Sequence, residues 1–121
     1  MSITKIRRRL AAVVAAGAAI AALVPSPANA TTVCNATGLV ATPGSMQVLL
    51  EAHASDPDAS TMYIACGIVQ NGRTVAHISA IGSKAAAAAD VFTIALAPYS
   101  ICREYRITYT NRPPAVFDGC P

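Results

Sequence analysis

A two-residue turn between two apolar runs constrains the fold of this chain more than any other feature. Asn71-Gly72 separates the runs 61–70 and 73–81, and both residues tolerate the positive φ angles that a two-residue hairpin turn requires. Upstream, residues 46–54 are apolar at every second position, a pattern typical of a strand with one face in water. The sequence therefore predicts antiparallel strands joined by short turns.

Further strands follow, separated by turn-forming residues at intervals of roughly ten positions. The run 61–70 is almost continuously apolar, which predicts a central strand covered on both faces. Five consecutive alanines, Ala85–Ala89, are too few for a stable isolated helix, and we expect a loop or a short helical turn there. The remaining predicted strands are 90–97, 101–110 and 115–120, with a further short one near Leu39–Ala41.

The first thirty residues have the three parts of a secretory signal peptide. Met1–Arg9 is basic, Leu10–Val24 is apolar and uncharged, and Ala28-Asn29-Ala30 provides small residues at a cleavage site. The apolar run is shorter than the roughly 20 residues that a membrane-spanning helix needs. We predict a cleaved signal peptide over 1–30, a secreted protein, and no membrane association after cleavage.

Without this leader the charge of the chain changes sign. The whole sequence has nine basic and six acidic side chains, and four of the basic ones lie in the leader. Residues 31–121 thus keep five basic against six acidic side chains, a net charge of −1. Nucleic-acid binding needs a basic patch, so we expect no nucleic-acid partner.

Residues 31–121 are enough for one domain. Short strands without a long helix favour an all-β fold. We predict a small antiparallel β-sandwich, immunoglobulin-like in outline, with two disulfides.

The disulfide prediction rests on an even number of cysteines in an exported chain. Their spacings are too wide for the paired ligands of a zinc site, and we predict no metal or cofactor. A Cys66–Cys102 bridge across two sheets, with Cys34–Cys120 joining the termini, is slightly preferred and resembles immunoglobulin-like domains in outline. The sequential pairing, Cys34–Cys66 with Cys102–Cys120, is nearly as well supported.

Arginine and tyrosine gather on the predicted strand 101–110, and these residue types anchor many interfaces. Here we predict a binding surface formed by Arg103, Tyr105, Arg106 and Tyr109. The alternative is that Tyr105, Ile107 and Tyr109 line the core, while Arg106 pairs with Glu104 on the surface.

Catalytic patterns are weak. His77 and Ser79 would share one face of a strand, but residues two apart lie about 7 Å from each other, too far for a direct hydrogen bond. No nucleophile elbow is present. Asp56 and Asp58 are interpreted as a solvated turn, because the glycine and later glutamate of a calcium loop are missing. We predict no enzyme activity, with a small hydrolase as the weakest alternative.

In size, leader and cysteine count the chain is similar to actinobacterial amylase inhibitors and to chromoprotein apoproteins. It has no tryptophan and so lacks the Trp-Arg-Tyr triplet of those inhibitors, and no apoprotein motif is found. No family is assigned on this basis. The sequence predicts a secreted, disulfide-stabilised binding domain for a protein or a surface polymer, the alternative being a structural component of the cell envelope.

Overall fold

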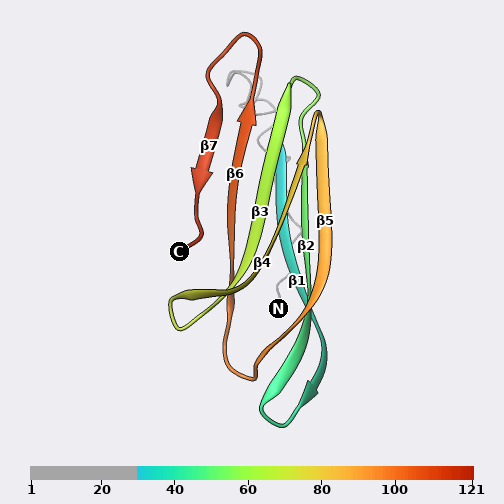
Figure 1. The fold of residues 1–121 in the computed structure, drawn as a ribbon, viewed down its shortest axis with the longest axis vertical. Helices are drawn as coiled ribbons and strands as arrows, with labels where there is room; N and C mark the ends of the chain where they lie inside the picture. The colour runs from blue at the N-terminus through green and yellow to red at the C-terminus, as the bar shows by residue number, and fades with distance from the viewer. Residues whose placement is uncertain (1–29) are drawn as a thin grey trace, which may run out of the picture.

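The fold is described from a computed structural model, which covers residues 30–121; the predicted signal peptide lies outside the described residues apart from Ala30. The described chain forms strands and no helix, which confirms the predicted all-β class. No helix of residues 30–121 is long and apolar enough to cross a membrane. The strands are β1 (Thr31–Thr42), β2 (Ser45–Ser55), β3 (Thr61–Gln70), β4 (Arg73–Gly82), β5 (Ala85–Ala95), β6 (Ser100–Thr108) and β7 (Ala115–Asp118) (Figure 1).

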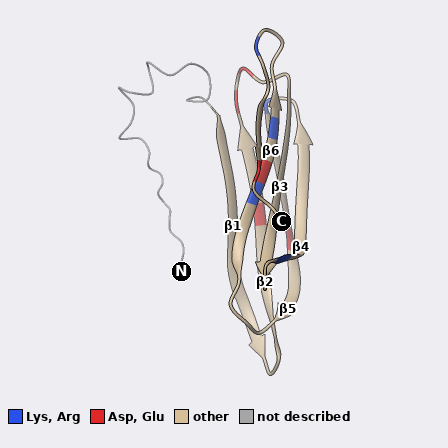
Figure 2. Cartoon of the chain, turned by 90° about the vertical axis from the view of Figure 1, so that its left-hand side faces the viewer, with Lys and Arg blue, Asp and Glu red and all other residues tan. Residues whose placement is uncertain are grey.

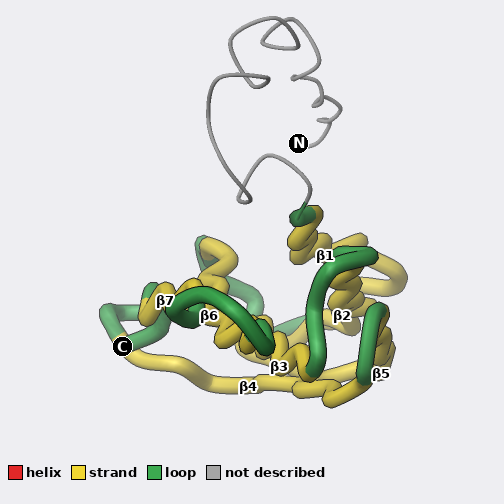
Figure 3. Tube along the Cα trace, turned by 90° about the horizontal axis from the view of Figure 1, so that it is seen from above, coloured by secondary structure: helices red, strands yellow, loops and turns green. Residues whose placement is uncertain are grey.

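These strands form two antiparallel sheets. Sheet A has the order β1-β2-β5, and sheet B has the order β4-β3-β6-β7. Seen from above, β1, β2 and β5 stand together, apart from β7, β6 and β3 (Figure 3). The order differs from a constant-type immunoglobulin domain in one strand, because β4 joins sheet B instead of pairing with β5. The predicted antiparallel sandwich is confirmed.

The core lies between the two sheets and follows the predicted alternation. Every second residue of β2 from Val48 to Ala54 is buried, and so is every second residue of β3 from Met62 to Ile68. Ile107 of β6 is also fully buried. Each large aliphatic side chain contributes roughly 1.5–3 kcal/mol when it leaves water, so these facing rows hold the two sheets together.

The predicted hairpin is confirmed, because Asn71 and Gly72 have φ angles of 53° and 75° and join β3 to β4. A second two-residue turn at Pro43 and Gly44 joins β1 to β2. β1 spans twelve residues, far more than the short strand expected at Leu39–Ala41. Its sequence has little apolar alternation, and its strand conformation depends on pairing with β2 along its length.

The alanine run is neither a loop nor a helical turn, so that prediction was wrong. Ala85–Ala89 form the first half of β5, which ends at Ala95, and they pair with residues 51–55 of β2. Ala86 is buried in the core. Pairing with an existing strand outweighs the intrinsic helix preference of alanine.

The two disulfides are Cys34–Cys66 and Cys102–Cys120, so the preferred pairing was wrong and the sequential one is found. Gly67, not Cys66, lies opposite Cys102 in the β3–β6 register. Successive strand residues point to opposite faces, so Cys66 points into the core and Cys102 points to the outer face of sheet B. Two disulfides are consistent with an extracellular protein.

The second disulfide holds the C-terminal segment across the outer face of sheet B. The Thr74 hydroxyl donates a 3.0 Å hydrogen bond to the Pro121 carbonyl, and the Gly119 N–H donates one of 3.0 Å to the Arg103 carbonyl. A Cβ atom at Gly67 would lie 2.7 Å from the Cys102 sulfur. Only glycine therefore fits beneath this bridge without displacement.

Candidate functional site

The four residues predicted as one binding surface lie on two faces of sheet B. Arg103, Tyr105 and Tyr109 are on the side that faces sheet A, together with the buried Ile107. Arg106 is exposed on the outer face. The core contacts of Tyr105 and Tyr109 agree with the alternative interpretation, but no ion pair joins Arg106 to Glu104 in residues 30–121.

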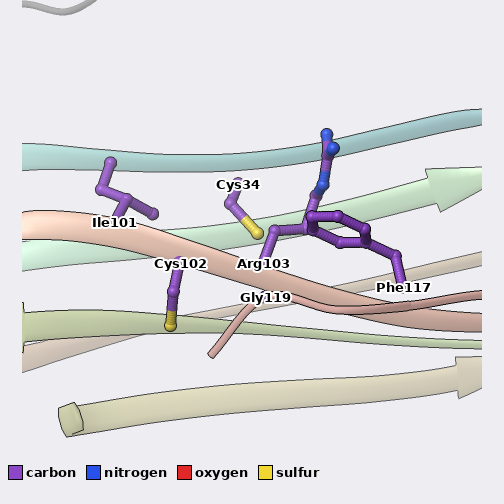
Figure 4. Close-up of a pocket in the computed structure, with 6 residues that line it drawn as sticks. All are labelled: Cys34, Ile101, Cys102, Arg103, Phe117 and Gly119. Carbon is purple, nitrogen blue, oxygen red and sulfur yellow. The ribbon is translucent and has the colours of Figure 1, made fainter. Parts of the chain in front are cut away.

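Arg103 borders an open groove at the side of the sandwich, which we call the Arg103 groove. It has a volume of about 370 Å³ and lies where β1 approaches β6 and the segment after β7 (Figure 4). Its lining residues are Cys34, Ile101, Cys102, Arg103, Phe117 and Gly119. Arg103 is the only charged residue among them.

The Arg103 side chain is held in this groove from two sides. Its Nη1 donates a 3.2 Å hydrogen bond to the Thr32 carbonyl of β1. Its guanidinium carbon lies 5.7 Å and 5.4 Å from the ring centres of Tyr105 and Phe117, which are stacked 5.7 Å apart. Aromatic faces attract cations at this range, so the two rings stabilise the charge of Arg103. No carboxylate oxygen of the described residues lies within 4.0 Å of the guanidinium nitrogens.

Tyr109 belongs instead to a polar cluster at one end of the sandwich. Its hydroxyl donates a 2.6 Å hydrogen bond to Asp56 Oδ2, and the Arg112 guanidinium stacks on its ring at 3.9 Å. Burial, followed by the hydrogen bond to Asp56, raises the pKa of the Tyr109 phenol above its usual value. This cluster fixes the end of β6 against the β2–β3 turn.

The turn predicted at Asp56 and Asp58 is found, and Asp58 is exposed. Asp56 is completely buried, so the prediction that it is solvated was wrong. Its Oδ1 accepts a 2.9 Å hydrogen bond from the Asp58 N–H, the arrangement of an Asx turn. Lys84 Nζ donates to the Pro57 carbonyl at 3.0 Å. The two carboxylate oxygens of Asp56 accept hydrogen bonds from Asp58 and Tyr109. This buried side chain therefore stabilises the turn.

A second depression, the outer-face hollow, lies on the outer face of sheet B and has a volume of about 400 Å³. The small residue Ala65 of β3 lies at its floor. Polar groups converge on it from three strands, because Tyr63, His77 and Glu104 line its sides. Cys66, Thr74, Cys120 and Pro121 complete the lining.

Beside this hollow, one row of cross-strand neighbours runs over all four strands of sheet B. The register places Ile81 next to Tyr63, Tyr63 next to Arg106, and Arg106 next to Val116. Ile81 is 73% exposed and Val116 is 46% exposed. Apolar side chains flanking a tyrosine and an arginine are the composition of an interface centre.

Sequence reasoning did not identify Tyr63 or Ile81 as candidate site residues. The sequence does indicate the position of Tyr63. It lies between Met62 and Ile64, which both point into the core, so its side chain points to the opposite face. Ile81 shares the exposed face of β4 with His77. Strand periodicity places each residue on a face, but the cross-strand row appears only once the register is known.

The weaker catalytic candidates are also placed by the fold. His77 and Ser79 share the exposed face of β4, as predicted, and no hydrogen bond joins their side chains in residues 30–121. His53 lies on the exposed face of sheet A with Glu51. Within the described residues, no group of three histidine, cysteine or acidic side chains could hold a metal ion.

Comparison of this chain with protein-family models, with curated proteins and with solved structures gives no match.

Proposed function

We propose that this chain is an exported, non-enzymatic binding domain whose partner, a protein or a surface polymer, contacts the outer face of sheet B. The observation that carries the proposal is the outer-face hollow, where the polar side chains of Tyr63, His77 and Glu104 converge around Ala65. A concave site with a few convergent polar groups is the common form of a binding site. The basic, apolar and small-residue segments of the leader support export.

The neighbouring residues support an interface here. Ile81 and Val116 leave apolar surface in water on either side of Tyr63 and Arg106. Tyrosine and arginine are the residue types whose truncation most often weakens an interface. The partner would cover the apolar side chains while Glu104 and His77 offer hydrogen-bonding groups at the edge of the hollow.

The test compares two double variants of the purified, oxidised protein. Tyr63→Ala with Arg106→Ala changes the proposed surface, and Gln47→Ala with Thr93→Ala changes a cross-strand pair on the exposed face of sheet A. Retention of each protein is measured on extracellular proteins and on cell-wall material of the producing cells. We expect at least tenfold weaker retention of the Tyr63/Arg106 variant on one of these fractions, and unchanged retention of the control.

Equal retention of the wild type and both variants would contradict the proposal. In the cell-wall fraction, that result is the one expected of a structural envelope component without a discrete ligand. Turnover of an ester or glycoside substrate that is lost in His77→Ala, with the fold intact, would contradict the non-enzymatic assignment.

A further inference from the structure

Within residues 30–121, β7 leaves the start of β6 without a partner strand on the edge that faces away from β3. The β6–β7 pairs run only from Glu104 to Ile107, although β6 begins at Ser100. The Arg103 carbonyl accepts a hydrogen bond from Gly119 and so points away from β3. Backbone groups two residues apart on a strand point the same way, so the N–H and carbonyl of Ile101 also point away from β3, at a place that β7 does not reach.

This free backbone edge borders the Arg103 groove. Ile101 and Phe117 line the groove and are 36% and 44% exposed, so apolar surface is available beside the unpaired N–H and carbonyl groups. Figure 4 shows Ile101 and Phe117 on either side of Arg103, with β1 running past them. Such an edge can bind an added strand. Main-chain hydrogen bonds provide affinity, and the adjacent surface selects the side chains at alternate positions of the bound strand.

The positive charge of Arg103 favours an extended peptide that carries an acidic side chain. Arg103 is the only charged residue among the described residues that line it, and the Arg103 Nε is buried without a hydrogen-bond partner in residues 30–121. The nearest acidic residues in sequence, Glu104 and Asp118, form a cross-strand pair on the outer face, opposite to the side of Arg103. β1 adds no charge, since all of its side chains are neutral (Figure 2). A carboxylate in the groove would therefore meet an uncompensated guanidinium.

We infer that the Arg103 groove binds an extended acidic peptide, which pairs with the free Ile101 edge of β6 and places one carboxylate against Arg103. This site is separate from the outer-face hollow and goes beyond the function proposed above. The bound segment would lie beside β6 on the same edge as β7, next to the residues near Ser100 that β7 does not pair with. Its apolar side chains would contact Ile101 and Phe117.

The test uses two capped hexapeptides of high strand propensity, TVTEVT and TVTQVT, which differ only in the charge of one side chain. Binding to the ¹⁵N-labelled, oxidised protein is followed by NMR. We expect TVTEVT to bind at least tenfold more tightly than TVTQVT. We also expect its largest shifts at the Ile101 amide and at the Arg103 Nε–H.

Three variants separate the contributions. Arg103→Gln should remove the preference for the acidic peptide. Arg73→Gln removes an exposed arginine of the β3–β4 hairpin that does not line the groove, and it should leave that preference intact. Ile101→Pro removes one free N–H donor. Because this N–H points away from β3, the β3–β6 pairing should persist, and unchanged amide shifts elsewhere would show it. We expect both peptides to bind Ile101→Pro at least fivefold more weakly.

Equal affinities of the two peptides for the wild-type protein would overturn the inference. It would also be overturned by shifts centred on β4 or β5, by no binding at millimolar peptide, or by a folded Ile101→Pro protein that binds both peptides as the wild type does.

Discussion

The phenol of Tyr109 donates a 2.6 Å hydrogen bond to a carboxylate oxygen of Asp56, a residue with no exposed surface. The two residues are 53 positions apart in the chain, and their contact joins the segment after β6 to the turn between β2 and β3. The other carboxylate oxygen accepts the Asp58 N–H. One buried side chain therefore shapes the turn and holds it against the sheet.

Replacing Tyr109 with phenylalanine is expected to destabilise the fold by about 1–3 kcal/mol, because a buried carboxylate oxygen loses its donor. The matched control is Tyr105→Phe, on the same side of sheet B, whose hydroxyl makes no hydrogen bond in the described chain. Chemical unfolding measures both. Equal losses for the two variants would contradict the role assigned to this hydrogen bond.

The raised pKa of Tyr109 predicts a loss of stability in alkali. Folded Tyr109 keeps its proton at pH values where an unfolded tyrosine, with a pKa of about 10, has lost it. Its contribution to the free energy of unfolding is complete below pH 10 and disappears as the pH rises through the higher folded value. Unfolding midpoints measured between pH 8 and 11 should fall less steeply for Tyr109→Phe than for the wild type; parallel curves would contradict this.

Gly67 is expected to tolerate no larger residue. A Cβ atom there would lie 2.7 Å from the Cys102 sulfur and 3.0 Å from the Thr74 methyl carbon, so Gly67→Ala should cost about 1–3 kcal/mol through overpacking. The control is Gly38→Ala, because its Cβ would meet only a methionine methyl group at 3.9 Å. Thermal unfolding compares them, and similar melting temperatures would show that the bridge can move aside.

The two disulfides should contribute to different parts of the fold. Cys34–Cys66 joins sheet A to sheet B through the core and closes a separation of 32 residues, so replacing both cysteines with serine should cost roughly 3–4 kcal/mol. Replacing Cys102 and Cys120 should mainly free the C-terminal segment and expose the amides of β3 and β6 to hydrogen exchange. Non-reducing peptide mapping tests the pairing itself, and a Cys66–Cys102 peptide would contradict it.

The predicted leader gives a direct test of export. Protein purified from the culture medium is expected to begin at Thr31, because Ala28-Asn29-Ala30 provides the small residues of a cleavage site. Intact-mass measurement of oxidised and reduced protein identifies both the first residue and the number of disulfides. The mass of the uncleaved 121-residue chain, or four free thiols, would contradict the prediction.

Local sequence was enough to predict features that depend on neighbouring residues. The alternation over 46–54 identified the buried face of β2, because side chains alternate along any strand. Asn71-Gly72 identified the hairpin because its two residues adopt positive φ without strain. The even cysteine count predicted two disulfides. From these features the all-β fold class followed without knowledge of the register.

The tertiary structure decided what depends on contacts between distant strands. The β3–β6 register places Cys66 and Cys102 on opposite faces and so determines the disulfide pairing. Ala85–Ala89 form a strand because they pair with β2, although alanine by itself favours a helix. The β3–β4 and β3–β6 registers also align Arg106 with Tyr63 and Ile81. Alternation along one strand tells which residues share a face, but the residue that lies opposite on a neighbouring strand is decided by contacts between segments far apart in the sequence.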